Sequence, residues 1–384
     1  MIKLSKRIND CAISETLRLD TLAKEMQSRG ENIINLAAGQ PDFETFLAVK
    51  KAVINAVGKG NNKYSAPAGM PLLKKAVIEL IKRDYKIKYQ LSEIIITNGA
   101  KQGLYGIFQV LLNPGDEVIV PVPAWVSYIE QVKLAGGKPV IINTTKDFHL
   151  DISAIKNSIT NKTKLIVLNS PNNPTGAVYS RAELLALNKI IKHKNILVIS
   201  DDPYRYILFD KKFYSFAQIN KEQTIIVDSI SKSHSVPGWR LGWAAGPAEI
   251  IKAMNKLQGQ ICGNVCNLAQ MAGIKALSLP KKTINPWIKE YNKRRNYLIT
   301  ELSKIKELSF IVPEGAFYFF INIYKITKNS VAFCEQLLKK EKLVLVPGKA
   351  FGLDGFVRWS FAFSIKDLKE AIKRLNNFIN KYGR

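Results

Sequence analysis

The sequence predicts an α/β fold in which helices cover both faces of a mostly parallel β-sheet. Short, continuous apolar runs occur at 94–97, 118–120, 165–168, 196–199 and 225–227. Helical patterns alternate with these runs, beginning near Lys101 and near Trp125 and covering 181–192. Continuous apolar strands separated by helices are typical of a parallel sheet that is buried on both faces. With 384 residues, of which 47% are apolar, the chain can bury the large core that such a fold needs.

Two helices are expected before the first of these strands. One covers 14–30 and ends at Gly30, because glycine commonly follows the last residue of a helix. The other covers 72–84 and follows Pro71, because proline is well tolerated in the first turn of a helix. The segment 72–84 repeats its apolar residues at helical spacing.

The pattern changes after about residue 283 and predicts a smaller domain of α+β type. The elements expected there are, in order, a helix from 286 to about 302, strands at 310–312 and 317–320, a helix near 329–340, a strand at 343–346 and a closing helix at 366–381. The N-terminal segment is expected to join this domain. We therefore predict a large domain over 48–282 and a small domain formed by 1–47 and 283–384.

The net charge of the chain is strongly positive, at +26. The lysines are dispersed, often in pairs such as 74–75 and 211–212, rather than gathered in a patch or a tail. We interpret the charge as a composition bias and expect no nucleic-acid partner. The N-terminus lacks an apolar signal segment and no run of about 18 apolar residues occurs, so we expect a cytoplasmic protein without membrane association.

The four cysteines are too few and too scattered for a disulfide framework. Three residues separate Cys262 from Cys266, and no second Cys or His pair accompanies them. We therefore expect reduced thiols and no metal site.

The segment 229–240 carries the most specific chemical signal. Its Ser-Ile-Ser-Lys sequence places Lys232 beside hydroxyl side chains, and Arg240 follows eight residues later. A lysine amine can form a Schiff base with an aldehyde cofactor. An arginine together with hydroxyl groups can hold a dianionic phosphate. The segment therefore indicates an enzyme that uses pyridoxal 5′-phosphate (PLP).

Other motifs lie at or near predicted strands, and the carboxyl ends of parallel strands are where such sheets bind ligands. The segment 97–102 opens a helix whose N–H groups can approach a phosphate, although such turns often only start a helix. The segment 169–176 is either a rigid turn or a ligand loop. Asp201 is either a helix cap or the partner of a protonated pyridine nitrogen. Arg358 interrupts an apolar strand and needs an anion there, such as a substrate carboxylate.

In this order and combination, the motifs resemble those of the fold-type I PLP-dependent aminotransferases, class I/II, and specifically the aspartate aminotransferase family. The resemblance runs from about Ser14 to the C-terminus and includes 39–43, 64–69, 123–125, 313–317 and 346–348. It implies a large domain with a mostly parallel seven-stranded sheet, a smaller α+β domain and a PLP cofactor. It also implies a homodimer that shares its active sites between subunits.

The resemblance implies a role for each matching residue. Lys232 would form the internal aldimine and then act as acid and base, Asp201 would pair with the pyridinium nitrogen, and Tyr204 would bond the phenolic oxygen of the ring. The neighbouring Arg240 and partial desolvation are expected to lower the pKa of Lys232. The implied cofactor-binding residues are Gly99, Ala100, Lys101, Trp125, Asn173, Asp201, Tyr204, Ser229, Ser231, Lys232, Arg240 and, from the neighbouring subunit, Tyr64. The implied substrate-binding residues are Gly39, Trp125, Asn173 and Arg358.

The expected reaction is transfer of an amino group from an L-amino acid, aspartate first, to 2-oxoglutarate. Lys101 and a hydroxyl of Ser14 or Thr16 are candidates to bind the second carboxylate of such a substrate. An aromatic (tyrosine) or alanine aminotransferase is the first alternative, because the segment 236–240 also looks like those enzymes. A PLP-dependent β-lyase is the second alternative.

Departures from the family pattern bear on the substrate rather than on the reaction class. They are Phe46, His234, the segment 235–237 and Val265. We interpret His234 as a packed or solvated histidine in preference to a cofactor contact.

Overall fold

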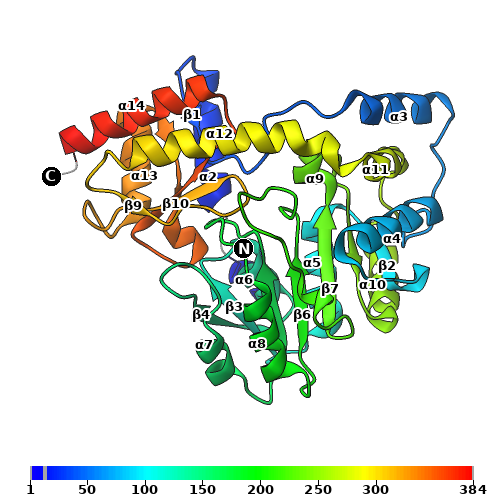
Figure 1. Cartoon of the computed structure of the whole chain (residues 1–384). Helices are drawn as coiled ribbons and strands as arrows, with labels where there is room; N and C mark the ends of the chain where they lie inside the picture. Colours follow the sequence, from blue (N-terminus) through cyan, green and yellow to red (C-terminus); the bar gives the residue numbers. More distant parts are fainter. Residues whose placement is uncertain (1, 12–14, 383–384) are drawn as a thin grey trace.

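The computed structural model describes residues 2–11 and 15–382, and for residues 15–17 the backbone alone. Its centre is a seven-stranded sheet with the order β2-β8-β7-β6-β5-β3-β4 (Figure 1). Adjacent strands are parallel except at β8, which runs antiparallel to both neighbours. The predicted mostly parallel sheet is therefore confirmed. Its strands are β2 (Ile94–Thr97), β3 (Glu117–Val122), β4 (Lys138–Asn143), β5 (Thr163–Asn169), β6 (Leu197–Asp201), β7 (Thr224–Ser229) and β8 (Gly242–Ala245).

Helices cover both faces of this sheet, and the alternating side chains of β3 pack against both layers. Val118 and Val120 belong to one apolar cluster, together with residues of α5. Ile119 belongs to another cluster, together with residues of α7 and α8. The helices of this part are α3 (Leu47–Gly58), α4 (Pro71–Tyr85), α5 (Gly99–Leu111), α6 (Ser127–Leu134), α7 (Ile152–Ser158), α8 (Arg181–Ile191), α9 (Ile230–Ser233), α10 (Ala248–Ile261) and α11 (Asn267–Ser278).

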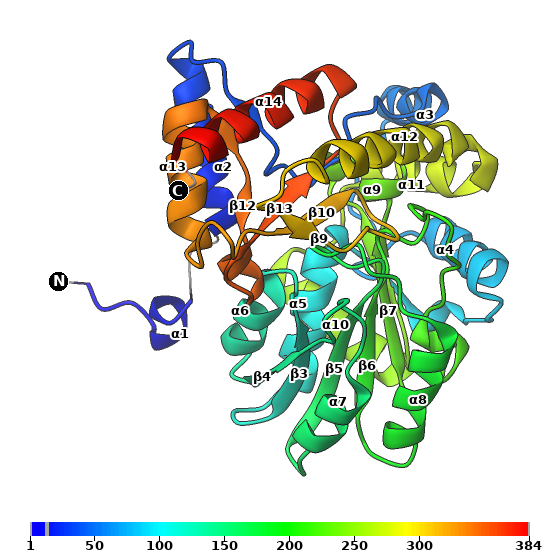
Figure 2. The same cartoon turned by 60° about the vertical axis from the view of Figure 1, so that its left-hand side comes forward.

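Two small sheets lie above the carboxyl ends of the central strands (Figure 2). One has the order β12-β13-β10-β9, and the other pairs β1 with β11. One large apolar cluster joins these two sheets to the helices around them, as expected for the α+β part. The domain boundaries, 48–282 for the large domain and 1–47 with 283–384 for the small one, stay a prediction. The elements of this part are α2 (Glu15–Ser28), β1 (Ile34–Asn35), α12 (Asn285–Leu302), β9 (Ser309–Phe310), β10 (Tyr318–Asn322), α13 (Ser330–Glu341), β11 (Leu343–Val344), β12 (Val346–Pro347), β13 (Phe356–Ser360) and α14 (Ile365–Tyr382). The short helix α1 (Lys6–Asn9) buries no side chain in this cluster and lies near α6.

The prediction of one strand over 343–346 is wrong. Residues 343 and 344 pair in parallel with β1, whereas residues 346 and 347 pair antiparallel with β13. The chain therefore changes partners at Leu345. All of these side chains are buried, and a continuous apolar run does not indicate where such a change of partner occurs.

The described part of the chain contains no helix that is both long and apolar enough to cross a membrane. Within the same ranges, no group of three or more His, Cys, Asp or Glu side chains is placed to hold a metal ion. Cys262, Cys266 and Cys334 carry free thiols.

Candidate active site

A cavity of about 410 Å³ opens where the central strands end. Its lining contains most of the predicted site residues, namely Gly39, Ala100, Lys101, Trp125, Asn173, Asp201, Tyr204, Ser229, Ser231, Lys232, Arg240 and Arg358. Gly99 lies directly beside it, in contact with Arg240. Tyr64 does not line it, and its side chain is 99% exposed on this chain. The assignment of Tyr64 to a neighbouring subunit stays a prediction.

Lys232 enters the cavity from α9, the short helix that directly follows β7. Its Nζ donates a hydrogen bond to the carbonyl oxygen of Gly39. Burial, followed by the charges of Arg358 and Arg240, lowers the pKa of Lys232 to about 8. The expected effects of desolvation and of Arg240 are confirmed, and Arg358 is a further cause. The amine therefore loses its proton more readily than that of an exposed lysine.

Asp201 is the last residue of β6, and its carboxylate is buried at the cavity. A turn at 203–206 follows it, so the alternative of a helix cap is wrong. Oδ2 of Asp201 accepts a hydrogen bond from the Tyr128 hydroxyl, whereas Oδ1 has no partner among the described residues. Burial raises the pKa of Asp201 to about 7. A buried carboxylate with an unpartnered oxygen fits a protonated ring nitrogen.

Tyr128 is a site residue that the sequence analysis missed. It lies one helical turn after Trp125, and the two rings pack edge to face with centroids 5.4 Å apart. Tyr128 is fully buried, and a buried tyrosine needs a hydrogen-bond partner. The spacing of Trp125 and Tyr128 on a predicted helix was the signal that could have identified it.

The residues expected to hold a phosphate form a positively charged corner of the cavity. Gly99 begins α5 with a φ of +75°, and a Cβ there would come within 2.6 Å of the Arg240 guanidinium. Lys101 follows in the first turn of α5, and burial together with the charge of Arg240 lowers its pKa. Ser229 and Ser231 face the same cavity. Two cations that reach the cavity from its open side, together with hydroxyl groups and a helix N-terminus, fit the phosphate of PLP.

Arg358 reaches the cavity from β13, and only 3% of its surface is exposed. It donates hydrogen bonds to Oδ1 of Asn173 at 3.0 Å and to the carbonyl oxygen of Ala37 at 2.6 Å. Its Nε has no partner and it makes no ion pair within the described ranges. A buried cation without a carboxylate fits an anionic substrate group.

Tyr204 and Tyr318 form the wall between Arg358 and Gly39. Their hydroxyl groups lie 2.9 Å apart, and the Arg358 guanidinium lies 4.5 Å from the centre of the Tyr318 ring. A Cβ at position 39 would come within 2.9 Å of the Tyr318 hydroxyl, so this approach requires glycine. Tyr318 is a second site residue that the sequence analysis missed. It directly follows the motif 313–317, which the resemblance already included, and this position was the signal that could have identified it.

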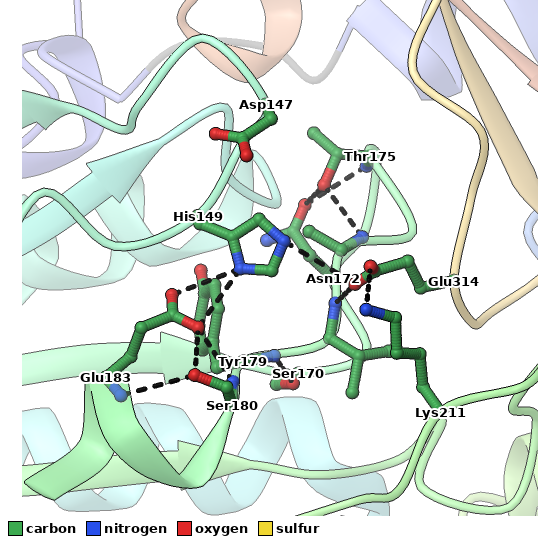
Figure 3. A network of polar contacts seen from close by, with 12 residues as sticks. Asp147, His149, Ser170, Asn172, Thr175, Tyr179, Ser180, Glu183, Lys211 and Glu314 are labelled. Carbon is green, nitrogen blue, oxygen red and sulfur yellow. Dashed lines mark hydrogen bonds and ion pairs between the residues drawn. The ribbon is translucent and has the colours of Figure 1, made fainter.

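The segment 169–176 is both a rigid turn and part of the site. Figure 3 shows Asn172 accepting hydrogen bonds from the backbone and the hydroxyl of Thr175, while Ser170 accepts one from the backbone of Tyr179. Asn169 adds bonds to the backbones of Asn173 and Asp201. These bonds fix the position of Asn173 relative to Asp201.

Of the residues that depart from the family pattern, only Pro237 lines the cavity, whereas Phe46, His234, Ser235, Val236 and Val265 lie outside its lining. His234 is buried, with its ring nitrogens 2.9 Å from the Ser233 hydroxyl and from the carbonyl oxygen of Ala276. Its burial, these contacts and its position outside the cavity lining confirm the interpretation as a packed histidine, and burial lowers its pKa to about 4. Phe46 stacks on Trp287, and Val265 is fully buried. Ser14 and the side chain of Thr16 lie outside the described residues.

Comparison with known proteins gives a consistent result. The sequence model of the family "Aminotransferase class I and II" matches residues 31–375. The chain is 42% identical to the aspartate aminotransferase of Bacillus subtilis (strain 168), with all of both chains covered. It is also 42% identical to a probable aspartate/prephenate aminotransferase of Rickettsia typhi, over 98% of this chain and 99% of that protein. The solved structure of Thermus thermophilus aspartate aminotransferase with maleate superimposes with a TM-score of 0.94 at 36% identity, covering 98% of this chain and 100% of the other.

Proposed function

We propose that the cavity lined by Lys232 is the active site of this chain, which belongs to the class I and II aminotransferase family. The chain is a PLP-dependent aminotransferase, a transferase of amino groups between amino acids and 2-oxo acids, with aspartate as the favoured donor and 2-oxoglutarate as acceptor. One observation carries the assignment of the site. A partly buried lysine with a lowered pKa shares one cavity with an unpartnered carboxylate oxygen of Asp201 and with the Arg358 cation, which makes no ion pair among the described residues.

PLP, when bound, supplies an electron sink for the negative charge that develops at the substrate α-carbon. Lys232 would hold the cofactor covalently until the substrate amine displaces it, and its freed, neutral amine would then take the proton from the substrate α-carbon and deliver it to the cofactor. The carboxylate of Asp201 would keep the ring nitrogen protonated, and Tyr128 holds that carboxylate in place. Tyr204 is proposed to hydrogen-bond the phenolic oxygen of the ring, and Trp125 to lie against its face.

The phosphate is proposed to bind where α5 begins, against Gly99, Ala100 and Lys101, with Ser229, Ser231 and Arg240 as further donors. Tyr64 is proposed to add a contact from a second subunit, which accords with its 99% exposure on this chain. We therefore propose a homodimer that shares its active sites. A cytoplasmic location is part of the same proposal.

Arg358 and Asn173 are proposed to bind the α-carboxylate of the substrate beside Gly39. A guanidinium can bind a carboxylate through two parallel hydrogen bonds, so it fixes the orientation of the α-carbon relative to Lys232. Lys101 is proposed to attract a second carboxylate, because it also lines a neighbouring open cavity of about 760 Å³. This arrangement favours aspartate over alanine and tyrosine as donor.

The proposal is tested with purified protein and PLP. We expect visible absorption of the bound cofactor, and formation of a 2-oxo acid from aspartate only when 2-oxoglutarate is present. Comparing aspartate, tyrosine and alanine as donors decides between the alternatives. Pyruvate and ammonia formed without an acceptor would indicate the β-lyase, and an absence of PLP binding would overturn the assignment of the site.

A further inference from the structure

A buried network of charged side chains lies behind the cavity, on residues that do not line it. Its centre is Arg205, which lies in the turn after β6 and is 4% exposed. Nε of Arg205 donates to Oδ2 of Asp228 on β7, and Nη1 donates to Oδ2 of Asp84 on α4, both at 2.7 Å. The guanidinium also stacks on the Tyr206 ring, at 3.9 Å from its centre. One side chain thus links three segments that are distant in the sequence.

Asp228 connects this network to the active site. Its Oδ1 accepts a hydrogen bond of 2.6 Å from the backbone N–H of Ser229. Ser229 is the N-cap of α9 and accepts a bond from the backbone of Ser231, and Lys232 is the next residue. The Asp228 carboxylate therefore accepts a hydrogen bond from Arg205 through Oδ2 and one from the backbone of Ser229 through Oδ1. Ser229 begins the segment that carries Ser231, a candidate phosphate contact, and Lys232.

We propose that Arg205 is a positioning residue for PLP, which acts through Asp228 on the segment Ser229–Lys232 without touching the cofactor. The inference rests on the proposed function, because it concerns how firmly that site holds PLP. The functional residues around the cavity are explained by the cofactor and the substrate, whereas Arg205 and Asp228 are not. Water hardly reaches either side chain, so each charge is stabilised by its partner in place of water.

The physical reason lies in the cost of an unpaired charge in the interior. Burial raises the pKa of Asp228, and the charge and hydrogen bond of Arg205 act against that rise. Without Arg205 the Asp228 carboxyl either stays charged without its partner or takes up a proton. Either outcome changes the acceptor that holds the Ser229 N–H, and it also changes the charge behind Asp201, whose pKa Asp228 raises.

The test measures the affinity of the apoprotein for PLP by equilibrium titration of the visible absorption, together with the free energy of unfolding of the apoprotein. Arg205→Met is expected to weaken PLP binding by about tenfold or more, the size of one lost hydrogen bond to a charged group. Asp228→Asn is expected to weaken it similarly. The double variant is expected to lose little more than the weaker-binding single variant, because both residues act through one link.

Arg374→Met is the matched control, since Arg374 is an arginine largely shielded from solvent that pairs with a carboxylate, Glu370, but lies on α14 outside the cavity lining. It is expected to lower stability without changing the affinity for PLP. If Arg205→Met fails to fold, Arg205→Lys decides, because it keeps the charge but cannot reach both carboxylates, and it should bind PLP less tightly than wild type. An unchanged affinity in the folded Arg205 variant, or additive losses in the double variant, would overturn the inference. An absence of PLP binding by the wild type would instead overturn the proposed function.

Discussion

Tyr128 donates its hydroxyl hydrogen to one oxygen of Asp201, while the other oxygen of the same buried carboxylate has no partner among the described residues. Burial raises the pKa of Asp201, and the bond from Tyr128 opposes that rise. The tyrosine therefore favours the ionised carboxylate, which is the form that can stabilise a protonated ring nitrogen. A residue absent from the sequence prediction thus sets the protonation of one that was predicted.

Tyr128→Phe should weaken PLP binding by about tenfold, because Asp201 loses a hydrogen bond to its charged form. The pKa of Asp201 should rise further in this variant. The acidic limb of the kcat/KM profile should therefore move to higher pH, and a pH series with aspartate and 2-oxoglutarate measures it. Tyr179→Phe is the control, as Tyr179 is buried outside the cavity lining. An acidic limb at the wild-type pH in Tyr128→Phe would contradict the role of this bond.

Arg358→Met should raise KM for the amino acid and lower kcat/KM by about two orders of magnitude, as expected for two lost charge-assisted hydrogen bonds. The affinity for PLP should stay near that of the wild type, because Arg358 is assigned to the substrate carboxylate. Steady-state kinetics and PLP titration of the same preparation separate the two effects. A large loss of PLP affinity with an unchanged KM would show that the assignment is wrong.

Lys101→Ala should lower kcat/KM for aspartate more than for alanine or tyrosine, since only aspartate carries a second carboxylate. The ratio of kcat/KM for aspartate to kcat/KM for alanine should fall about tenfold, the contribution of one charge-assisted contact. Lys101 also lies at the phosphate corner, so PLP affinity is measured in parallel. A uniform loss with all donors, together with weaker PLP binding, would mean that Lys101 serves the phosphate alone.

His149 should make stability depend on pH. Its Nδ1 lies 3.1 Å from Glu183, and its Nε2 lies 3.6 Å from Glu314, which also pairs with Lys211 (Figure 3). The bond with Glu183 raises the pKa of His149 above its ordinary value, and Glu314 and Asp147 contribute further. A raised pKa means that the stabilisation is fully present below the unfolded pKa and is lost as pH rises through the folded pKa.

His149→Gln should therefore lower the free energy of unfolding at pH 5.5 by about 1 kcal/mol or less, the range for a partly exposed pair, and by less than that at pH 9. Urea unfolding of the apoprotein at both pH values measures the difference. A loss of equal size at the two pH values would indicate a packing effect in place of an ionic one.

Much of the fold and of the site could be predicted from the sequence because the signals are local. Continuous apolar runs marked the parallel strands, and Lys232, Asp201 and Arg358 each stand in a short motif at or near a strand. The change of partner at Leu345 gave no signal, since the whole run is buried. The pattern of apolar residues in a sequence indicates which side chains are buried, but it does not indicate which strand pairs with which.

Contacts between distant segments explain what the sequence reasoning missed. Tyr128 and Asp201 are 73 residues apart, and Arg205 meets Asp84 across 121 residues. A single sequence shows neither pairing, because no pattern within one segment indicates which distant residue it contacts. Asp201 ends β6 and Arg205 lies in the turn that follows, whereas Tyr128 reaches Asp201 from α6 and Asp84 reaches Arg205 from α4.

The most direct measurement locates the covalent attachment of the cofactor. The protein with bound PLP is treated with borohydride, which reduces a carbon–nitrogen double bond to a stable single bond, and its peptides are then analysed by mass spectrometry. The cofactor mass should appear on Lys232, and Lys232→Ala should show neither the attachment nor turnover of aspartate. Attachment at another lysine, or full turnover by Lys232→Ala, would contradict the assignment of Lys232 as the catalytic residue.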